Sequence, residues 1–522
     1  MGDDITKSVI ADNGMKAPMT AAASSGGVRA CPPPLDLYRE SSKNPAGKTR
    51  KRSDFKEYDA AEKSKWKTRR RLINARLSAI SRSWIEEAGA SERYRGLIEC
   101  GRVPLAGGCG SVVRYENGAV SYNGVARCGS AWACPECAGL KLWKASKKIA
   151  RLLEWLGREN EKRAGRENEN RYSAVLLTLT VPHHVGDSLK NQVAGFSAGF
   201  SHLMNSGEVR KAKKSLGYKC SVRAFDFTVR EVHEVPDWHC HLHCLLVFDG
   251  AEMSGVFEDG RMRGEASPSF VRLLETLWGQ WSKKSVKKCF GDGLECSPRA
   301  FGLEAVELGG SSGVADYVAK VVSCYISGGS KEKGGEGGKY TPFELLSNRP
   351  DGLAFRKRAW LEYVAATKGR RRINFSTGWR ERLGGYVDEY DGRDGVDDEA
   401  APSPLWSFNP SADLVALMRE KPNMKNTAMT LAELNNPAAL ISSLCSSVGG
   451  GSPSAAGSVL AGSFIVDMGG EIRPWLERLA VCDGVELVGN VAKFEAPAAD
   501  GSKPSIPEVL GDWSPPDLIG VG

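Results

Sequence analysis

The chain has 522 residues, a length that fits about three domains of roughly 150 residues each. Hydrophobic residues make up 41% and charged residues 26%, so the chain can bury sizeable cores, and wholesale disorder is excluded. No apolar run approaches the roughly 20 residues that a membrane-spanning helix needs, and the N-terminus is acidic where a signal peptide is basic. We therefore expect a cytoplasmic protein that does not contact the membrane.

The formal net charge of +8 is mild, but basic residues gather near the N-terminus. Residues 1–47 are rich in small and polar residues, and we expect a disordered tail there. Residues 48–94 are expected to form a basic helical arm, because 13 basic and 4 acidic residues lie between Lys48 and Arg82. The arm is either a solvated segment or a contact for nucleic-acid phosphates, and the two roles are compatible.

Cysteines stand out in the next part of the chain. Fourteen cysteines without a signal peptide favour metal binding over a disulfide framework. Cys134 and Cys137 form a two-spaced pair of the zinc-knuckle kind, with Cys128 just upstream. Cys100 and Cys109 compete for the fourth position. Residues 95–140 are therefore predicted to be a cysteine-rich segment that binds a structural Zn²⁺, with buried free thiols as the alternative.

Residues 141–385 alternate between helical and strand-like patterns. Helices are predicted near residues 140–162, 194–204 and 269–284, and strands at 173–182, 222–234 and 238–248. Val235-Pro236-Asp237 is expected to turn the chain between the last two strands. This order predicts an α+β domain, in which flanking helices cover a central antiparallel sheet.

The composition changes again near the C-terminus. Residues 386–522 turn acidic and then rich in Pro, Ser, Gly and Ala, so we expect a partly disordered, low-complexity region without an assigned role. A basic run precedes this region and suits contact with a DNA backbone, and a solvated loop is the equal alternative. Its residues are Lys368, Arg370, Arg371 and Arg372.

Three histidines alternate along one predicted strand. His239, His241 and His243 therefore project from the same face, and imidazoles at this spacing can share one divalent ion. The alternative for a single histidine is a satisfied core residue, but three of the seven in the chain fall within five residues. Metallohydrolases also use a His-x-His strand, but they usually continue with Asp-His, and Cys244 and Leu245 follow here.

The motif His241-Leu242-His243 and the apolar residues after it resemble the His-hydrophobic-His motif of the HUH single-strand endonucleases. The wider string WHCHLH at residues 238–243 resembles the rolling-circle replication initiators of bacterial plasmids, with Cys240 where these usually have proline. Three further segments resemble motifs of that family in the family's order, so that the resemblance covers residues of about 95–385. They are LLTLTVP at 176–182, YVAK at 317–320 and CGSAWACPECA at 128–138.

The resemblance implies an HUH nuclease-like fold over residues 141–385 and a tyrosine nucleophile. Tyr317 would attack the scissile phosphate of origin DNA, and Lys320, one helical turn away, would bind phosphate or lower the pKa of the tyrosine. The next candidate nucleophile is Tyr325. The products would be a 5′-phosphotyrosyl enzyme and a free 3′-OH that primes synthesis. The resemblance also favours Cys100, which begins CGR, as the fourth zinc ligand.

The resemblance further implies a catalytic Mg²⁺ or Mn²⁺ on His241 and His243. Glu231 is our choice of third ligand, and Glu234 and His239 are alternatives, because side-chain parity is open without the strand register. Gly313 stands where many initiators carry the glutamate that activates water at termination, so the terminating residue stays open.

The expected partners are single-stranded or cruciform origin DNA and a host polymerase. A host helicase is also expected, because the chain has no phosphate-binding loop of the GxxxxGK[ST] type. Two alternatives remain open. One is a related transposase or relaxase, and the other is a zinc-containing DNA-binding regulator without nuclease activity. The sequence leaves open the host, the origin sequence, the metal used and the oligomeric state.

Overall fold

The computed structural model describes residues 60–494 with gaps. The gaps are residues 106–109, 117, 165–170, 182, 292–295, 309–338, 348–349, 384–385, 387–402, 421, 434–435, 449–459, 462, 469–471, 481 and 483–484. The predicted tail at 1–47 lies outside the described residues, as does the Tyr-x-x-Lys motif at 317–320.

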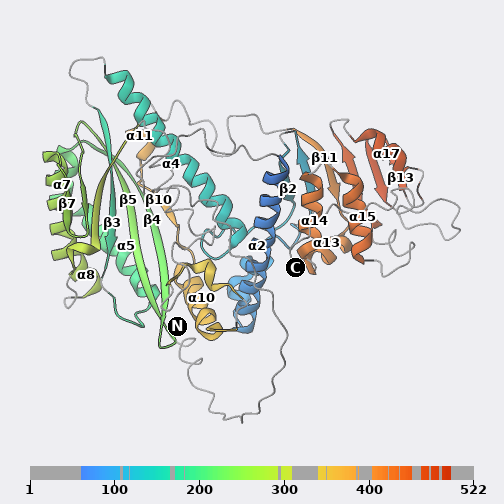
Figure 1. Cartoon of the computed structure of the whole chain (residues 1–522), viewed down its shortest axis with the longest axis horizontal. Coiled ribbons are helices and arrows are strands. Elements are labelled where there is room, and N and C mark those ends of the chain that lie inside the picture. Colours follow the sequence, from blue (N-terminus) through green and yellow to red (C-terminus); the bar gives the residue numbers. More distant parts are fainter. Residues whose placement is uncertain are drawn as a thin grey trace, which may run out of the picture. The chain divides into compact units, whose positions relative to one another are not determined.

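The described chain contains helices and strands along its whole length (Figure 1). The longer helices are α2 (Ala60–Glu87), α4 (Pro135–Arg163), α5 (Leu189–Asn205), α6 (Gly207–Ser215), α7 (Pro268–Gln280), α10 (Leu353–Thr367), α13 (Ala412–Glu420), α14 (Pro422–Glu433) and α15 (Pro437–Val448). The shorter ones are α3 (Arg95–Glu99), α8 (Val286–Phe290), α11 (Trp379–Arg382) and α17 (Arg473–Leu479). The strands are β1 (Ser111–Tyr115), β2 (Val120–Asn123), β3 (Tyr172–Thr180), β4 (Tyr218–Val232), β5 (Val235–Asp249), β6 (Val256–Glu258), β7 (Arg261–Arg263), β8 (Phe301–Val306), β9 (Lys339–Tyr340), β10 (Ile373–Phe375), β11 (Pro404–Asn409), β12 (Phe464–Asp467), β13 (Val485–Val488) and β14 (Val491–Phe494).

The larger sheet has eight strands in the order β10-β4-β5-β3-β8-β6-β7, with β9 paired to β4. All its described pairings are antiparallel, which confirms the predicted α+β class with a central antiparallel sheet. The three predicted strands correspond to β3, β4 and β5, and the predicted helix near 140–162 corresponds to α4. The alternation of apolar residues located these elements because one face of each is buried.

The turn between β4 and β5 differs from its prediction. Val232 pairs with Val235, so the turn residues are His233 and Glu234, with φ of 50° and 62°. Two residues with positive φ form the tight hairpin turn whose twist matches the strands. Pro236 lies inside β5, at a level beyond the last pairing of β3 with β5 at His241. Proline is tolerated there because β5 has no β3 neighbour on that side.

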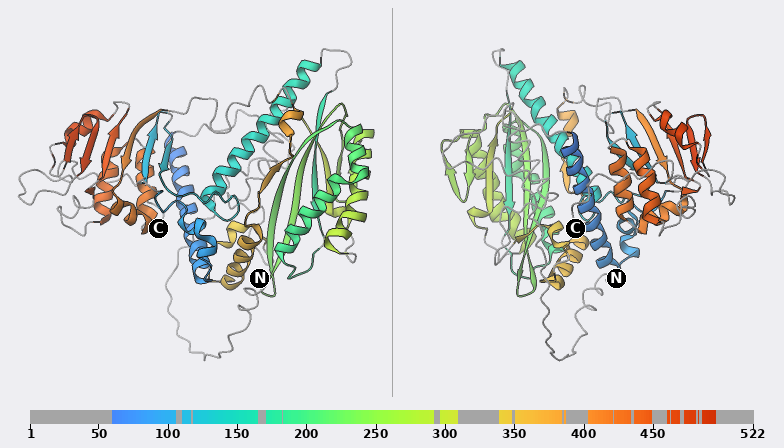
Figure 2. Two further views of the ribbon diagram at one scale, coloured as in Figure 1. Left: turned by 180° about the vertical axis from the view of Figure 1, so that it is seen from behind. Right: turned by 45° about the vertical axis from the view of Figure 1, so that its right-hand side comes forward.

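Helices cover both faces of the larger sheet. On one face, Leu152 and Leu156 of α4 pack against Leu245 and Val247 of β5. On the other face, α5, α7 and α10 pack against the alternate residues of β5, from Trp238 to Phe248. Figures 1 and 2 show α4 along one face and α5 with α7 on the opposite one. The histidines of β5 lie on the α4 face, nearer the turn than these packed residues.

A second, six-stranded antiparallel sheet has the order β13-β14-β12-β11-β1-β2. It joins β1 and β2, from the cysteine-rich segment, to strands from the predicted low-complexity region. Helices α13, α14 and α15 pack on it, and their core includes Trp406, Phe408 and Ile465, each fully buried. The described part of residues 404–494 therefore has a hydrophobic core. None of the described helices has the length and apolar character that crossing a membrane requires.

Candidate metal and nucleic-acid site

The histidine face of β5 is organised by hydrogen bonds to β3. In the antiparallel register, Thr178 lies opposite His243 and Thr180 opposite His241. The threonine hydroxyl oxygens are 3.0 Å and 2.9 Å from the Nδ1 atoms of His243 and His241. A partner on Nδ1 fixes the ring and leaves Nε2 as the nitrogen that can bind an ion. The two rings are nearly parallel, with centroids 6.2 Å apart.

A carboxylate faces this pair from β4. Asp226 lies opposite His241 in the register, and its Oδ2 is 4.0 Å from Nε2 of His243. Its Oδ1 is buried and has no hydrogen-bond partner among the described residues. Burial raises the pKa of Asp226 to about 6. A buried carboxylate oxygen without a donor is costly, and a divalent cation would satisfy it.

Asp226 was missed by sequence analysis, although the sequence contained a signal for it. Phe225, Phe227 and Val229 alternate on the buried face of β4, so Asp226 had to project from the other face. The missing information was the register, which places that face of β4 beside the histidines.

The predicted third ligand, Glu231, is not brought to the histidine pair. Glu231 is exposed, lies opposite Pro236, and has the parity of Phe227 and Val229 rather than that of Asp226. Its carboxylate lies beside Gly352, at the start of α10 on the other face of the sheet. Of the two alternatives, Glu234 is exposed in the turn, whereas His239 shares the face of His241 and lies opposite Thr228.

Burial keeps the three histidines neutral. Desolvation lowers the pKa of His239, His241 and His243 to about 4 in each case. A neutral imidazole is the form that binds a metal ion, so no proton has to be displaced from these rings at pH 7.

The four predicted cysteines come together at the start of α4. The Sγ atom of Cys100 is 3.6 Å from that of Cys134 and 3.5 Å from that of Cys137, and the Sγ atoms of Cys128 and Cys137 are 3.8 Å apart. Four sulfurs around one Zn²⁺ stand about 3.8 Å apart when each Zn–S bond is about 2.3 Å. The cluster could therefore hold a metal ion such as zinc. The alternative ligand, Cys109, lies outside the described residues.

Local backbone geometry prepares this cluster. Cys134 caps the N-terminus of α4, where its sulfur accepts a hydrogen bond from the backbone N–H of Cys137, and Pro135 occupies the first turn. The backbone N–H of Cys128 donates to the sulfur of Cys100 in the same way. Side-chain hydrogen bonds, led by the one with the Cys128 thiol, lower the pKa of Cys100 to about 7, and the backbone N–H of Cys128 adds to this effect. Such donors favour the thiolate form that zinc requires.

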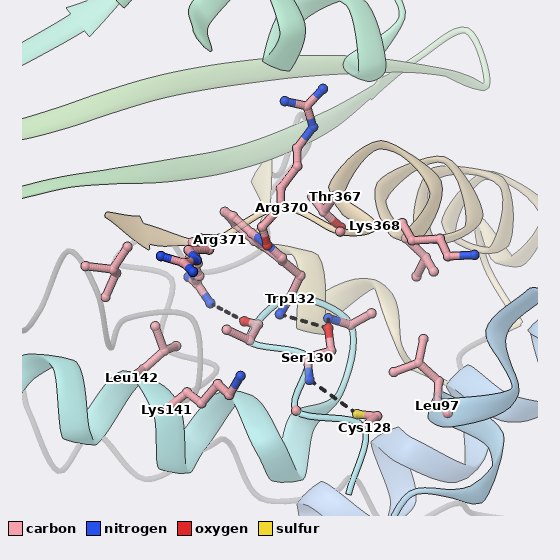
Figure 3. Close-up of a pocket in the computed structure, with 18 of the residues that line it drawn as sticks. Leu97, Cys128, Ser130, Trp132, Lys141, Leu142, Thr367, Lys368, Arg370 and Arg371 are labelled. Carbon is pink, nitrogen blue, oxygen red and sulfur yellow. Dashed lines mark hydrogen bonds between the residues drawn. The ribbon is translucent and has the colours of Figure 1, made fainter. Parts of the chain in front are cut away.

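A cavity of about 590 Å³ lies between the cysteine loop, α4 and the segment after α10. Figure 3 shows Lys141 from α4, and Lys368, Arg370 and Arg371 from beyond α10, around the loop that carries Cys128 and Trp132. Among the described residues that line it, none is acidic and seven are basic. The seven are Arg93, Lys141, Lys144, Lys368, Arg370, Arg371 and Arg372. A concave site lined by one sign of charge attracts phosphates.

The four predicted DNA-binding residues all line this cavity, but they are not equivalent. Lys368 and Arg371 are exposed, and Arg370 is half-buried. Arg372 is buried: its Nη1 donates to the carbonyl of Ala131 at 3.3 Å, and its guanidinium lies 5.2 Å from the centre of the Trp132 ring. Arg372 therefore joins the cysteine loop to the larger sheet.

Residues 122–255 match the family model described as "Replication protein". A protein of Streptomyces lividans named "Protein rep" is 25% identical over 320 residues, which cover 50% of this chain and 64% of that protein. The "Neomycin resistance protein" of Streptomyces cyanogenus is 24% identical over 187 residues, 31% of this chain and 39% of that protein. No solved structure matches.

These matches confirm the predicted resemblance to replication initiators, and they leave the HUH type as a prediction. The matched residues 122–255 include Asp226, both histidines of the pair and three of the four clustered cysteines. The chain matches less than two thirds of the length of either relative.

Proposed function

We propose that this chain, whose residues 122–255 resemble a replication-protein domain, initiates rolling-circle replication by nicking one strand at an origin. The observation that carries the proposal is the arrangement of His241, His243 and Asp226. Two neutral, oriented imidazoles and a half-buried carboxylate share one face of the sheet, inside the matched region. Such a donor set fits Mn²⁺ or Mg²⁺ better than it fits a packed core.

The chemistry follows from these residues. His241, His243 and Asp226 would hold the cation, with Asp226 in the place that the sequence suggested for Glu231. The bound cation supplies Lewis-acid polarisation of the scissile phosphate. The threonine hydroxyls on β3 orient both imidazoles, so the ligands need little reorganisation when the ion binds.

The nucleophile in this proposal is Tyr317, which lies outside the described residues and rests on the sequence motif alone. Its Oη would lose a proton and form a bond to phosphorus, while the bond from phosphorus to the 3′ oxygen breaks and that oxygen gains a proton. The covalent phosphotyrosine conserves the energy of the bond for rejoining at termination. Lys320 would bind the phosphate or lower the pKa of the tyrosine.

The basic cavity supports contact with origin DNA. Its seven cations have no acidic neighbours among the lining residues, and a zinc ion on the cysteines would hold the loop that forms one wall. Host helicase and polymerase complete the proposed replication reaction. A zinc-containing DNA-binding regulator is the second candidate, because this cavity suits phosphate binding without cleavage. That candidate gives no role to the buried histidines and Asp226.

Cleavage of single-stranded DNA tests the proposal. Tiled oligonucleotides covering the replicon that encodes the chain would be incubated with Mn²⁺ and the wild type, Asp226→Asn or Glu231→Gln. We expect site-specific cleavage by the wild type and by Glu231→Gln. Cleavage by Asp226→Asn should be slower by at least about 10–100-fold, which is the loss typical when a residue that supports a metal ligand is removed. Equal cleavage by all three proteins would contradict the role of Asp226, and the absence of cleavage by any would favour the regulator.

A further inference from the structure

A second group of metal-binding side chains lies on the same face, nearer the β4–β5 turn. Asp237 and His239 belong to β5, and His183 follows the end of β3. The Asp237 carboxylate is 1% exposed, with its Oδ1 3.1 Å from Nε2 of His183 and its Oδ2 3.6 Å from Nε2 of His239. The two imidazole rings meet edge to face, with centroids 4.3 Å apart.

One ligand atom from each of the three side chains lies within 4.8 Å of the others, close enough for all three to bind a common ion. Ligands on a tetrahedral cation with bonds of about 2.0–2.1 Å stand about 3.4 Å apart. Nε2 of His239 is buried and has no hydrogen-bond partner among the described residues, although it points into the cluster. Nδ1 of His183 lies 3.4 Å from the carbonyl of Val181, which turns Nε2 of that ring toward Asp237. A contact of this kind on Nδ1 is typical of a histidine whose Nε2 binds a metal ion.

Arg230 also contacts this group. Its Nε donates to Oδ2 of Asp237 at 2.5 Å, so one lone pair of the carboxylate is already used. A carboxylate has about four acceptor positions, and a hydrogen-bonded ligand is common around bound metals. The competing interpretation is a closed network of Arg230, Asp237 and His183 that holds no ion. It leaves the buried Nε2 of His239 unexplained.

We propose that His183, Asp237 and His239 bind a second divalent cation, separate from the one on His241, His243 and Asp226. Two imidazoles and one carboxylate suit a first-row transition ion such as Mn²⁺, Co²⁺ or Zn²⁺. Three protein ligands leave a coordination position for a phosphate oxygen. His239 and His241 are two residues apart on the strand, about 7 Å. The second ion would therefore bind the phosphate next to the scissile one, a role that rests on the proposed function.

Manganese binding by the full-length protein tests this site. The zinc-containing protein would be dialysed against Mn²⁺, and bound manganese would be counted by elemental analysis. The variants are His183→Asn, His239→Asn and the double variant His241→Asn/His243→Asn. His184→Asn is the matched control, because His184 is the exposed neighbour of His183.

We expect two manganese ions in the wild type and in His184→Asn, and one in each other variant. Two ions in His183→Asn would overturn the proposal. The wild type could also bind a single manganese ion that is absent from both His183→Asn and the double variant. This result would overturn the proposal, because the histidines would then share one site. His241→Asn/His243→Asn could bind as many manganese ions as the wild type while His183→Asn and His239→Asn bind fewer. This result would support the second site and contradict the proposed site on His241 and His243.

Discussion

Burial shifts the pKa of Asp226 and of His243 in opposite directions, although the two side chains face each other. For His243 the pKa falls from 6.5 to about 4, so the folded state binds a proton less tightly than the unfolded chain does. The stability that follows is complete above pH 6.5 and is lost as the pH falls toward 4. For Asp226 the pKa rises from 3.8 to about 6, so its contribution is complete below 3.8 and is lost as the pH rises through 6.

A pH titration of stability measures this balance in protein without added Mg²⁺ or Mn²⁺. At about 1.4 kcal/mol per pKa unit, His243 alone should cost about 2 kcal/mol between pH 7 and 5, and Asp226 offsets about 1 kcal/mol. His239 and His241 act in the same direction as His243, so we expect a net loss on acidification. Urea unfolding of His243→Asn should show about 2 kcal/mol less loss than the wild type. An equal loss in the two proteins would contradict the assignment of His243 as a buried neutral ring.

Which carboxylate lies beside the histidine pair could not be predicted from sequence, because the answer depends on how β4 pairs with β5. The histidine pair was predicted because alternation on a strand needs no knowledge of the partner strand. The choice between Glu231 and Asp226 depends on the register of β4, and a shift of one residue moves every side chain to the other face. The turn at His233 and Glu234 sets that register, and the expected turn at residues 235–237 lay too far along the chain.

At the scale of elements, the cysteine cluster joins two helices that are distant in sequence. Cys100 ends α3 and Cys134 begins α4, while the loop from Cys128 to Trp132 between them forms one wall of the basic cavity. The spacing of Cys128, Cys134 and Cys137 was sufficient to predict three of the four members. The membership of Cys100 came from a family resemblance, and the structure places it among the other three.

Removal of one cysteine should therefore affect both zinc and DNA. We expect Cys134→Ser to lose the zinc and to bind single-stranded DNA at least about 10-fold more weakly, because the wall of the cavity loses its anchor. Zinc content and fluorescence anisotropy with a labelled oligonucleotide measure the two effects. Cys289→Ser is the control, since Cys289 lies outside the cluster and is only partly buried. Full zinc content in Cys134→Ser would contradict the site.

At the scale of the whole molecule, composition was a poor guide to the C-terminal region. The runs of Gly, Ser, Pro and Ala after residue 386 suggested low complexity, yet β11 to β14 form a sheet with helices packed on it. Val112 of β1 pairs with Phe408 of β11, nearly 300 residues later in the chain. A pairing over such a separation leaves no local pattern in the sequence. The larger sheet was predictable because β4 and β5 are neighbours in sequence.

A covalent protein–DNA intermediate separates the proposed nuclease from the DNA-binding regulator, because only the nuclease forms one. The measurement is a denaturing gel of the protein after incubation with labelled origin-strand DNA and Mn²⁺, comparing the wild type, Tyr317→Phe and Tyr325→Phe. We predict a denaturation-resistant protein–DNA adduct in the wild type and in Tyr325→Phe, and none in Tyr317→Phe or in His241→Asn/His243→Asn. An adduct that survives in Tyr317→Phe would contradict the assigned nucleophile. Tight binding with no adduct in any protein would contradict the nuclease itself.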